Sequence, residues 1–181
     1  MGEAKRLKAQ RTADLAAALR VELGRLAAPT SALEATLLPE IEALTFYEVE
    51  RAPDDILVYC NMKPQQCHTN AGEYARLDPE QKTRHISGWW KRGDIFYFHS
   101  VVLIGTKLFC VTPHRDKRPL SFAPDYDVHW RTLEDRHVSE RRGVDPPYLV
   151  RRDPDVVIAS AAMLLAELDA GADPYSLRFD V

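Results

Sequence analysis

Cys67 is the residue of this chain best placed for chemistry. It follows a loop that contains Pro64, and it opens a segment of helical composition from Gln66 to Leu77. A thiol in the first turn of a helix lies next to unpaired backbone N–H groups and the positive end of the helix dipole, which favour the thiolate. We therefore expect the pKa of Cys67 to be lowered and this thiol to be the most reactive in the chain.

A histidine in the most apolar part of the chain is the expected partner of this thiol. His99 lies within Ile95–Ile104, and alternation along a strand places it on the face opposite to Phe98 and Ser100. A polar ring in an apolar strand needs a partner, which a helix packed across the sheet would supply. We predict that Cys67 and His99 form a nucleophile and general-base pair.

A cysteine at a helix start, a histidine on a following strand and a polar residue on the next strand resemble the papain-like cysteine hydrolases. The NlpC/P60-like and transglutaminase-like branches are the most similar, and the resemblance implies a small hydrolase of bacterial or phage type. It covers the stretch from Tyr59 to His114, under half of the chain. The segments that carry it are Gln66–Asn70, Gly88–Trp90, His99–Val102 and Cys110–Pro113.

The resemblance implies a third residue that orients the imidazole, on the strand after His99. Thr112 is the predicted residue, and Cys110, His114 and Asp116 are the alternatives in place of the usual Asp or Asn. A backbone carbonyl or a water is a further alternative to a side chain in this role.

An oxyanion hole is also implied, formed by the Cys67 backbone N–H and one side-chain donor that precedes it in the chain. The candidate donors are Asn61, Gln65 and Gln66. Trp89 and Trp90 point to opposite faces of a strand and are the candidates for lining a substrate groove.

The implied reaction is attack of Cys67 on an amide carbonyl. His99 takes the thiol proton and later donates it to the leaving group, and the thioester is hydrolysed or transferred. The substrate is a protein or peptide with a peptide, isopeptide or glutamine-type bond. We expect no cofactor and no metal ion to take part.

Two other functions remain open from the sequence. One is a non-enzymatic interaction protein that uses its terminal helices to bind another chain. The other is a small zinc-binding protein, although the spacing of its candidate ligands is irregular and no paired Cys-x₂-Cys element occurs. These zinc candidates are Cys60, Cys67, His68, His99, Cys110 and His114.

The elements expected around these residues indicate an α+β fold: N-terminal helices, a Cys-bearing helix packed on a small antiparallel sheet, and a C-terminal helix. We divide the chain into an N-terminal helical segment, residues 1–45, and a papain-like α+β domain, residues 46–181. The expected helices are Glu3–Ala28, a short one from Ser31, Gln66–Leu77 and one that begins at Asp153-Pro154. The expected strands are Ile56–Tyr59, His85–Lys91, Ile95–Ile104 and Lys107–Thr112, and a loop-rich stretch runs from Thr112 to Pro147.

Composition limits the remaining possibilities. The chain has 181 residues, and 24 Lys and Arg against 27 Asp and Glu give a net charge of −3, which disfavours extensive nucleic-acid binding. The exception is contact by the basic N-terminal helix, through Lys5, Arg6, Lys8 and Arg11. The three cysteines suit a reducing compartment, so we expect a cytoplasmic protein, and no segment reads as a secretion signal or a membrane span.

Overall fold

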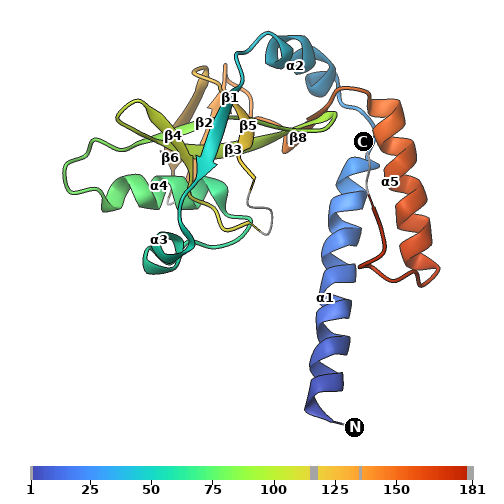
Figure 1. The fold of residues 1–181 in the computed structure, drawn as a ribbon. Coiled ribbons are helices and arrows are strands. Elements are labelled where there is room, and N and C mark those ends of the chain that lie inside the picture. Colours follow the sequence, from blue (N-terminus) through green and yellow to red (C-terminus); the bar gives the residue numbers. More distant parts are fainter. Residues whose placement is uncertain (1, 115–117, 135, 179–181) are drawn as a thin grey trace. The chain divides into compact units, whose positions relative to one another are not determined.

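The computed structural model describes residues 2–114, 118–134 and 136–178 (Figure 1). It is an α+β fold, as predicted. Contacts divide the chain into a helical unit, Met1–Ala32 with Arg151–Val181, and a sheet unit, Leu33–Val150. In chain order the elements are α1 (Glu3–Leu26), α2 (Ala32–Glu42), β1 (Tyr47–Arg51), α3 (Asp54–Tyr59), α4 (Cys67–Leu77), β2 (Arg84–Arg92), β3 (Ile95–Ile104), β4 (Lys107–Cys110), β5 (Leu120–Pro124), β6 (Val128–Leu133), β7 (Arg136–Arg141), β8 (Leu149–Arg151) and α5 (Pro154–Asp169).

Five strands of the sheet unit form a ladder that closes on itself. Their order is β2-β5-β1-β4-β3, and β2 pairs again with β3, while β8 lies on the other side of β3. The predicted antiparallel meander of β2, β3 and β4 is present. β1 runs parallel to β4 and antiparallel to β5, which runs antiparallel to β2. The sheet is therefore mixed rather than wholly antiparallel.

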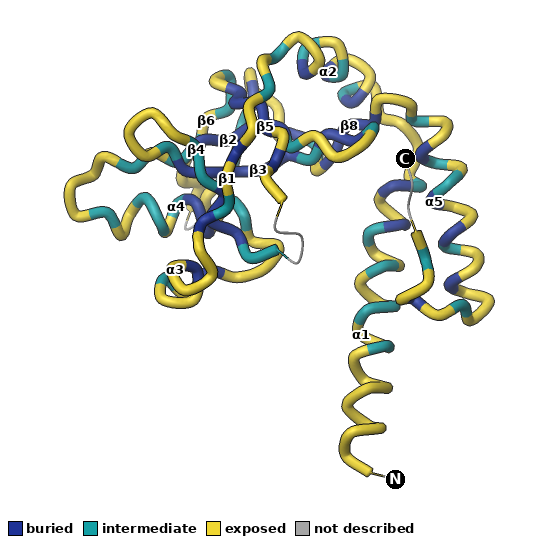
Figure 2. The backbone as a smooth tube through the Cα atoms, viewed as in Figure 1, coloured by how far each residue is buried: buried dark blue, intermediate teal, exposed yellow. Residues whose placement is uncertain are grey.

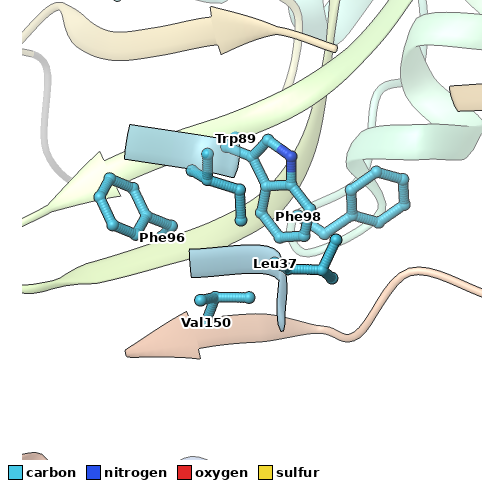
Figure 3. Packing of buried hydrophobic residues seen from close by; sticks show 6 residues of the cluster. Leu37, Trp89, Phe96, Phe98 and Val150 are labelled. Atoms are coloured by element: carbon cyan, nitrogen blue, oxygen red, sulfur yellow. The ribbon is translucent and has the colours of Figure 1, made fainter. Parts of the chain in front are cut away.

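Alternation along the strands gives the closed sheet an inner and an outer face. The inner face contains an apolar cluster to which all five strands contribute, with Val49, Val101 and Phe122 fully buried. On the outer face, α2 packs on Trp89, Phe96 and Phe98 of β2 and β3 (Figure 3), and α4 packs on β2 and β3. The Cys-bearing helix thus lies on the sheet, as expected.

Strands β2 and β5 approach each other closely at Gly88. This residue pairs with Pro124 of β5 on one side and with His99 of β3 on the other. A Cβ atom at this position would lie 2.0 Å from the carbonyl oxygen of Ala123 and 2.9 Å from Cζ of Phe122. Only glycine therefore fits here without moving β5 away from β2.

In the helical unit, α1 packs against α5. The Asp153 side chain caps α5 by accepting a hydrogen bond from the Val156 N–H, and Pro154 occupies the first turn. Buried Arg151 donates to the carbonyl oxygens of Leu26 and Ala28, both at 2.7 Å, and so satisfies groups that the end of α1 leaves open. The first turns of α1 are exposed (Figure 2).

Three expectations differ from the structure. Ile56–Tyr59, predicted as a strand, belongs to helix α3, because the acidic pair Asp54-Asp55 after Pro53 starts a helical turn. The stretch predicted as loop-rich contains β5, β6 and β7. The contacts group the C-terminal helix with α1, whereas the sequence suggested a division at residues 45 and 46.

None of the helices formed by the described residues combines the length and the apolar character that crossing a membrane requires.

We predict that Gly88→Ala destabilises the protein by about 3 kcal/mol, or about 10 °C in Tm, because the added methyl group overlaps the backbone of β5. Thermal unfolding followed by circular dichroism measures the change. Gly72→Ala in α4 is the matched control, since its new Cβ would lie 3.8 Å from His85 Nδ1, an ordinary contact. We expect this control to be neutral or more stable. Equal Tm values for the two variants would contradict the role of Gly88.

Candidate active site

The start of α4 places the Cys67 thiol at the edge of β3. Cys67 is the first residue of α4 and is half-buried. The Ser100 N–H donates a hydrogen bond to its sulfur, and the backbone N–H groups of Cys67 and His68 also interact with it. The thiol therefore lies beside the residue that follows His99 in the strand.

His99 points into the closed sheet, where its hydrogen bond goes to a different cysteine. Its Nε2 lies 3.4 Å from Cys110 Sγ, and both residues are buried. Within the described part of the chain, no hydrogen bond joins His99 to Cys67. Cys67 does interact electrostatically with Cys110, so Cys110 is near both Cys67 and His99. Cys110, not Thr112, is the residue bonded to the imidazole.

Thr112 has a structural role. Its Oγ1 accepts a hydrogen bond from Asn70 Nδ2 at 3.2 Å, and its carbonyl accepts one from Cys110 Sγ at 3.9 Å. Asn70 also bonds the Lys63 N–H and carbonyl, at 3.0 and 2.7 Å. These bonds tie the end of β4 to the loop that precedes Cys67. Asp116 lies outside the described residues.

Burial determines the charge of both candidate groups. It raises the pKa of Cys67 from 9.0 to about 11, despite the opposing effect of the Ser100 N–H. The expected lowering of this pKa by the helix start is therefore wrong. Burial also lowers the pKa of His99 to about 3, and the nearby His68, His114 and Arg51 add to the effect. At neutral pH the thiol and the imidazole are both uncharged.

A polar network that was not predicted from the sequence lies under α4. The Ser100 hydroxyl bonds His68 Nδ1 at 2.7 Å, His85 Nε2 at 2.8 Å and the Ser87 hydroxyl at 2.9 Å. The Trp130 indole N–H donates to Ser87 Oγ at 2.8 Å. Burial is the main cause that lowers the pKa of each histidine to about 4.

The hairpin register contained a signal for this network. Ser87 pairs with Ser100, and His85 lies two residues before Ser87, so alternation places all three side chains on one face. His68 and His85 are both half-buried and hydrogen-bonded.

The two tryptophans have different environments. Trp89 is fully buried, and its Nε1 donates to Asp125 Oδ2 at 2.9 Å, so it does not line a groove. Trp90 is half-buried on the inner face, with its ring 5.5 Å from that of His99 and 5.0 Å from that of His114. Of the two, only Trp90 adjoins the candidate site.

The three oxyanion candidates precede Cys67 in an exposed loop. Asn61 and Gln65 have left-handed backbones, with φ of 55° and 61°. Asn61 Oδ1 accepts a hydrogen bond from Lys63 Nζ at 2.5 Å. Gln66 is the N-cap residue of α4, but its side chain makes no capping hydrogen bond. The donors that reach the Cys67 sulfur are backbone N–H groups.

The zinc candidates do not converge on a metal site. Among the described residues, no three or more His, Cys, Asp or Glu side chains form a group that could hold a metal ion.

Two hollows lie on the surface. One, of about 350 Å³, is lined by Leu7, Arg11 and Tyr175, and the other, of about 260 Å³, by His129, Arg131 and Arg142. Neither hollow is lined by Cys67 or His99.

Comparisons of the chain with protein-family models, with curated proteins and with solved structures gave no match.

We predict that the His68–Ser100–His85 network makes stability depend on pH. Both histidines have a folded-state pKa of about 4, below the ordinary value of about 6.5, so acid protonates the unfolded chain first. Stability is then complete above pH ~6.5 and is lost as the pH falls towards ~4. Between pH 7.5 and 5 the loss is about 2 kcal/mol per histidine.

Urea unfolding of the wild type and of His85→Gln at pH 7.5 and 5 tests this prediction. The variant has one fewer buried titrating group, so its stability should depend less on pH. His137→Gln, at an exposed position of β7, is the control and should keep the wild-type dependence. The same pH dependence in wild type and His85→Gln would refute the assignment.

Proposed function

We propose that the protein is a cysteine-dependent hydrolase or acyltransferase that acts on an amide bond. Cys67 is the nucleophile, His99 the general base, and Cys110 a positioning residue. The observation that carries the proposal is the meeting of three segments: the start of α4, the middle of β3 and the end of β4. The Ser100 N–H, next to His99, bonds the Cys67 sulfur, and His99 bonds Cys110. The resemblance to papain-like cysteine hydrolases supports the same assignment.

The hydrogen bonds around Cys110 favour one tautomer of His99. The Cys110 thiol donates to the Thr112 carbonyl, so its sulfur is left to accept from His99 Nε2–H. The lone pair of the neutral ring is then on Nδ1. This nitrogen is the one we assign to take the proton of Cys67.

The proposed reaction begins with both groups neutral. As the sulfur attacks the carbonyl carbon, the thiol proton moves to His99 Nδ1, and the imidazolium then donates it to the leaving amine. The resulting thioester is cleaved by water or by an acceptor amine. Cys110 offers only a weak acceptor to the imidazolium, and the cationic Arg51 Nη1 lies 3.7 Å from its sulfur. We therefore expect turnover to be slower than with a carboxylate in this position.

A protein or peptide is the proposed substrate class, and the cytoplasm is the proposed compartment. The three cysteines are free thiols, which suits a reducing environment.

A second function is supported by the helical unit. Its helices expose the apolar side chains of Leu7, Val21, Val156 and Met163, each between 48% and 59% exposed. In this second proposal, apolar side chains of both helices bind another protein. Deletion of the first turns of α1, which contain Leu7, would weaken such binding and leave acyl transfer by the sheet unit unchanged.

We predict that p-nitrophenyl acetate acetylates Cys67 and that the rate rises with pH from neutral towards the pKa of about 11, since the thiolate is the nucleophile. Intact-mass and peptide mass spectrometry detect one acetyl group and its position. Cys67→Ser should prevent this labelling, and His99→Gln should slow both acetylation and release of acetate.

Cys60→Ser is the matched control, because Cys60 is also a half-buried free thiol but lies after α3. This variant should acetylate at Cys67 as the wild type does. Labelling confined to Cys60, or equal rates in His99→Gln and wild type, would end the catalytic proposal.

A further inference from the structure

Two arginines lie near Trp90, at the ends of strands β1 and β2. Arg51 is the last residue of β1 and pairs in register with Cys110, the last residue of β4. Arg92 is the last residue of β2 and pairs with Ile95, the first residue of β3. The two arginines lie on different strands, and both guanidinium groups approach the ring of Trp90.

Trp90 lies close to both arginines and to His99. The Cζ atoms of Arg51 and Arg92 are 5.9 and 6.0 Å from its ring centroid. The other neighbours of this ring include His99 and Tyr97, at 5.5 and 5.9 Å between centroids. Arg51 also donates to Cys110 Sγ, the atom that His99 bonds. One half-buried indole thus connects two guanidinium groups to the imidazole.

Neither guanidinium is neutralised by the described residues. The hydrogen bonds of Arg51 go to the Arg118 carbonyl, at 2.9 Å, and to Cys110 Sγ. In the described part of the chain, no carboxylate lies within ion-pair distance of Arg51 or Arg92. Arg141 shows the contrast, since Asp125 and Glu40 each bond it at 2.7 Å.

We propose that Arg51, at the end of β1, and Arg92, at the end of β2, form a subsite beside Trp90 for a carboxylate of the substrate. This inference rests on the proposed acyl-transfer function and names its substrate class: a peptide with a carboxylate close to the bond that is cleaved. A guanidinium presents paired donors that match a carboxylate, and the indole supplies an apolar wall that excludes water from this contact. The carboxylate is either a Glu or Asp side chain or the C-terminus of the peptide.

A bound carboxylate would also act on the candidate base. Arg51 is one of the charges that disfavour protonation of His99. An anion on its guanidinium offsets that charge, so the imidazolium formed during proton transfer is stabilised. Substrates with a carboxylate should therefore react faster as well as bind more tightly.

The test is a binding measurement on the full chain with Cys67→Ser, which removes the nucleophile and so separates binding from catalysis. Fluorescein-labelled tetrapeptides are titrated by fluorescence anisotropy. One has an internal Glu and an amidated C-terminus, one has internal Gln and a free C-terminus, and one has Gln and an amidated C-terminus. We expect at least one acidic peptide to bind about tenfold or more tightly than the neutral one.

Arg92→Gln and Arg51→Gln should each remove this preference by about tenfold, and Arg92 is exposed, so its variant is expected to fold normally. Lys107→Gln is the matched control, because Lys107 is an exposed cation at the opposite end of β4. Retention of the preference in Lys107→Gln supports the subsite, and which acidic peptide binds identifies the source of the carboxylate.

Equal binding of acidic and neutral peptides would overturn the subsite, as would equal losses in Arg92→Gln and Lys107→Gln. Displacement of the acidic peptide by a single-stranded oligonucleotide that binds more tightly would also overturn it in favour of a nucleic-acid surface. Arginine-dependent peptide binding together with absence of Cys67 acetylation in the wild type would keep the subsite and refute the acyl-transfer function.

Discussion

Strand β5 lies against β2 only because residue 88 has no side chain. The Ala123 carbonyl occupies the space that a Cβ of Gly88 would need, at 2.0 Å, and this contact lets the five-stranded ladder close. Closure creates an inner face, and the inner face holds His99 and Cys110 among apolar side chains. The close approach of β5 to β2 at Gly88 therefore underlies the hydrogen bond between His99 and Cys110. It also underlies the low solvent access that governs their charge.

Two opposing effects act on the Cys67 thiol, and their magnitudes decide its state. A helix start stabilises a nearby anion by about 0.3–1 kcal/mol in exposed positions and up to ~2 kcal/mol when partly buried. The rise in the pKa of Cys67 from 9.0 to about 11 corresponds to about 3 kcal/mol in favour of the thiol. Loss of hydration therefore outweighs the helix dipole. The proposed enzyme starts from a neutral pair, so transfer of the thiol proton is part of the chemical step.

Strand β3 serves two sites because its residues alternate between faces. His99 points inward to Cys110, and the side chain of the next residue, Ser100, points outward to His68 and His85. The backbone N–H of Ser100 bonds Cys67 at the strand edge. The outer network thus holds the peptide group that contacts the candidate nucleophile. The packing of α4 on the sheet is therefore sensitive to acid, since both histidines must remain neutral for it to form.

The amino-acid sequence by itself determined the α+β class, the long helices at both ends, and the meander that follows Cys67. The strand Ile95–Ile104 and the start of α5 after the Asp153 cap were predictable because periodicity, hairpin signals and capping act over a few residues. Sequence also indicated that Cys67 begins a helix. Local signals failed at α3, where Ile56–Tyr59 has strand composition but follows an acidic helix start.

Only the tertiary structure decided which side chains meet. β1 and β5 pair with strands far along the chain, and no short-range pattern specifies such partners. The choice of Cys110 over Thr112 as the partner of His99, and the place of Arg51 beside Trp90, follow from those pairings. The charge of Cys67 was decided there as well. The pKa of a group depends on how far the folded chain excludes water from it. The residues adjacent in sequence do not determine this burial.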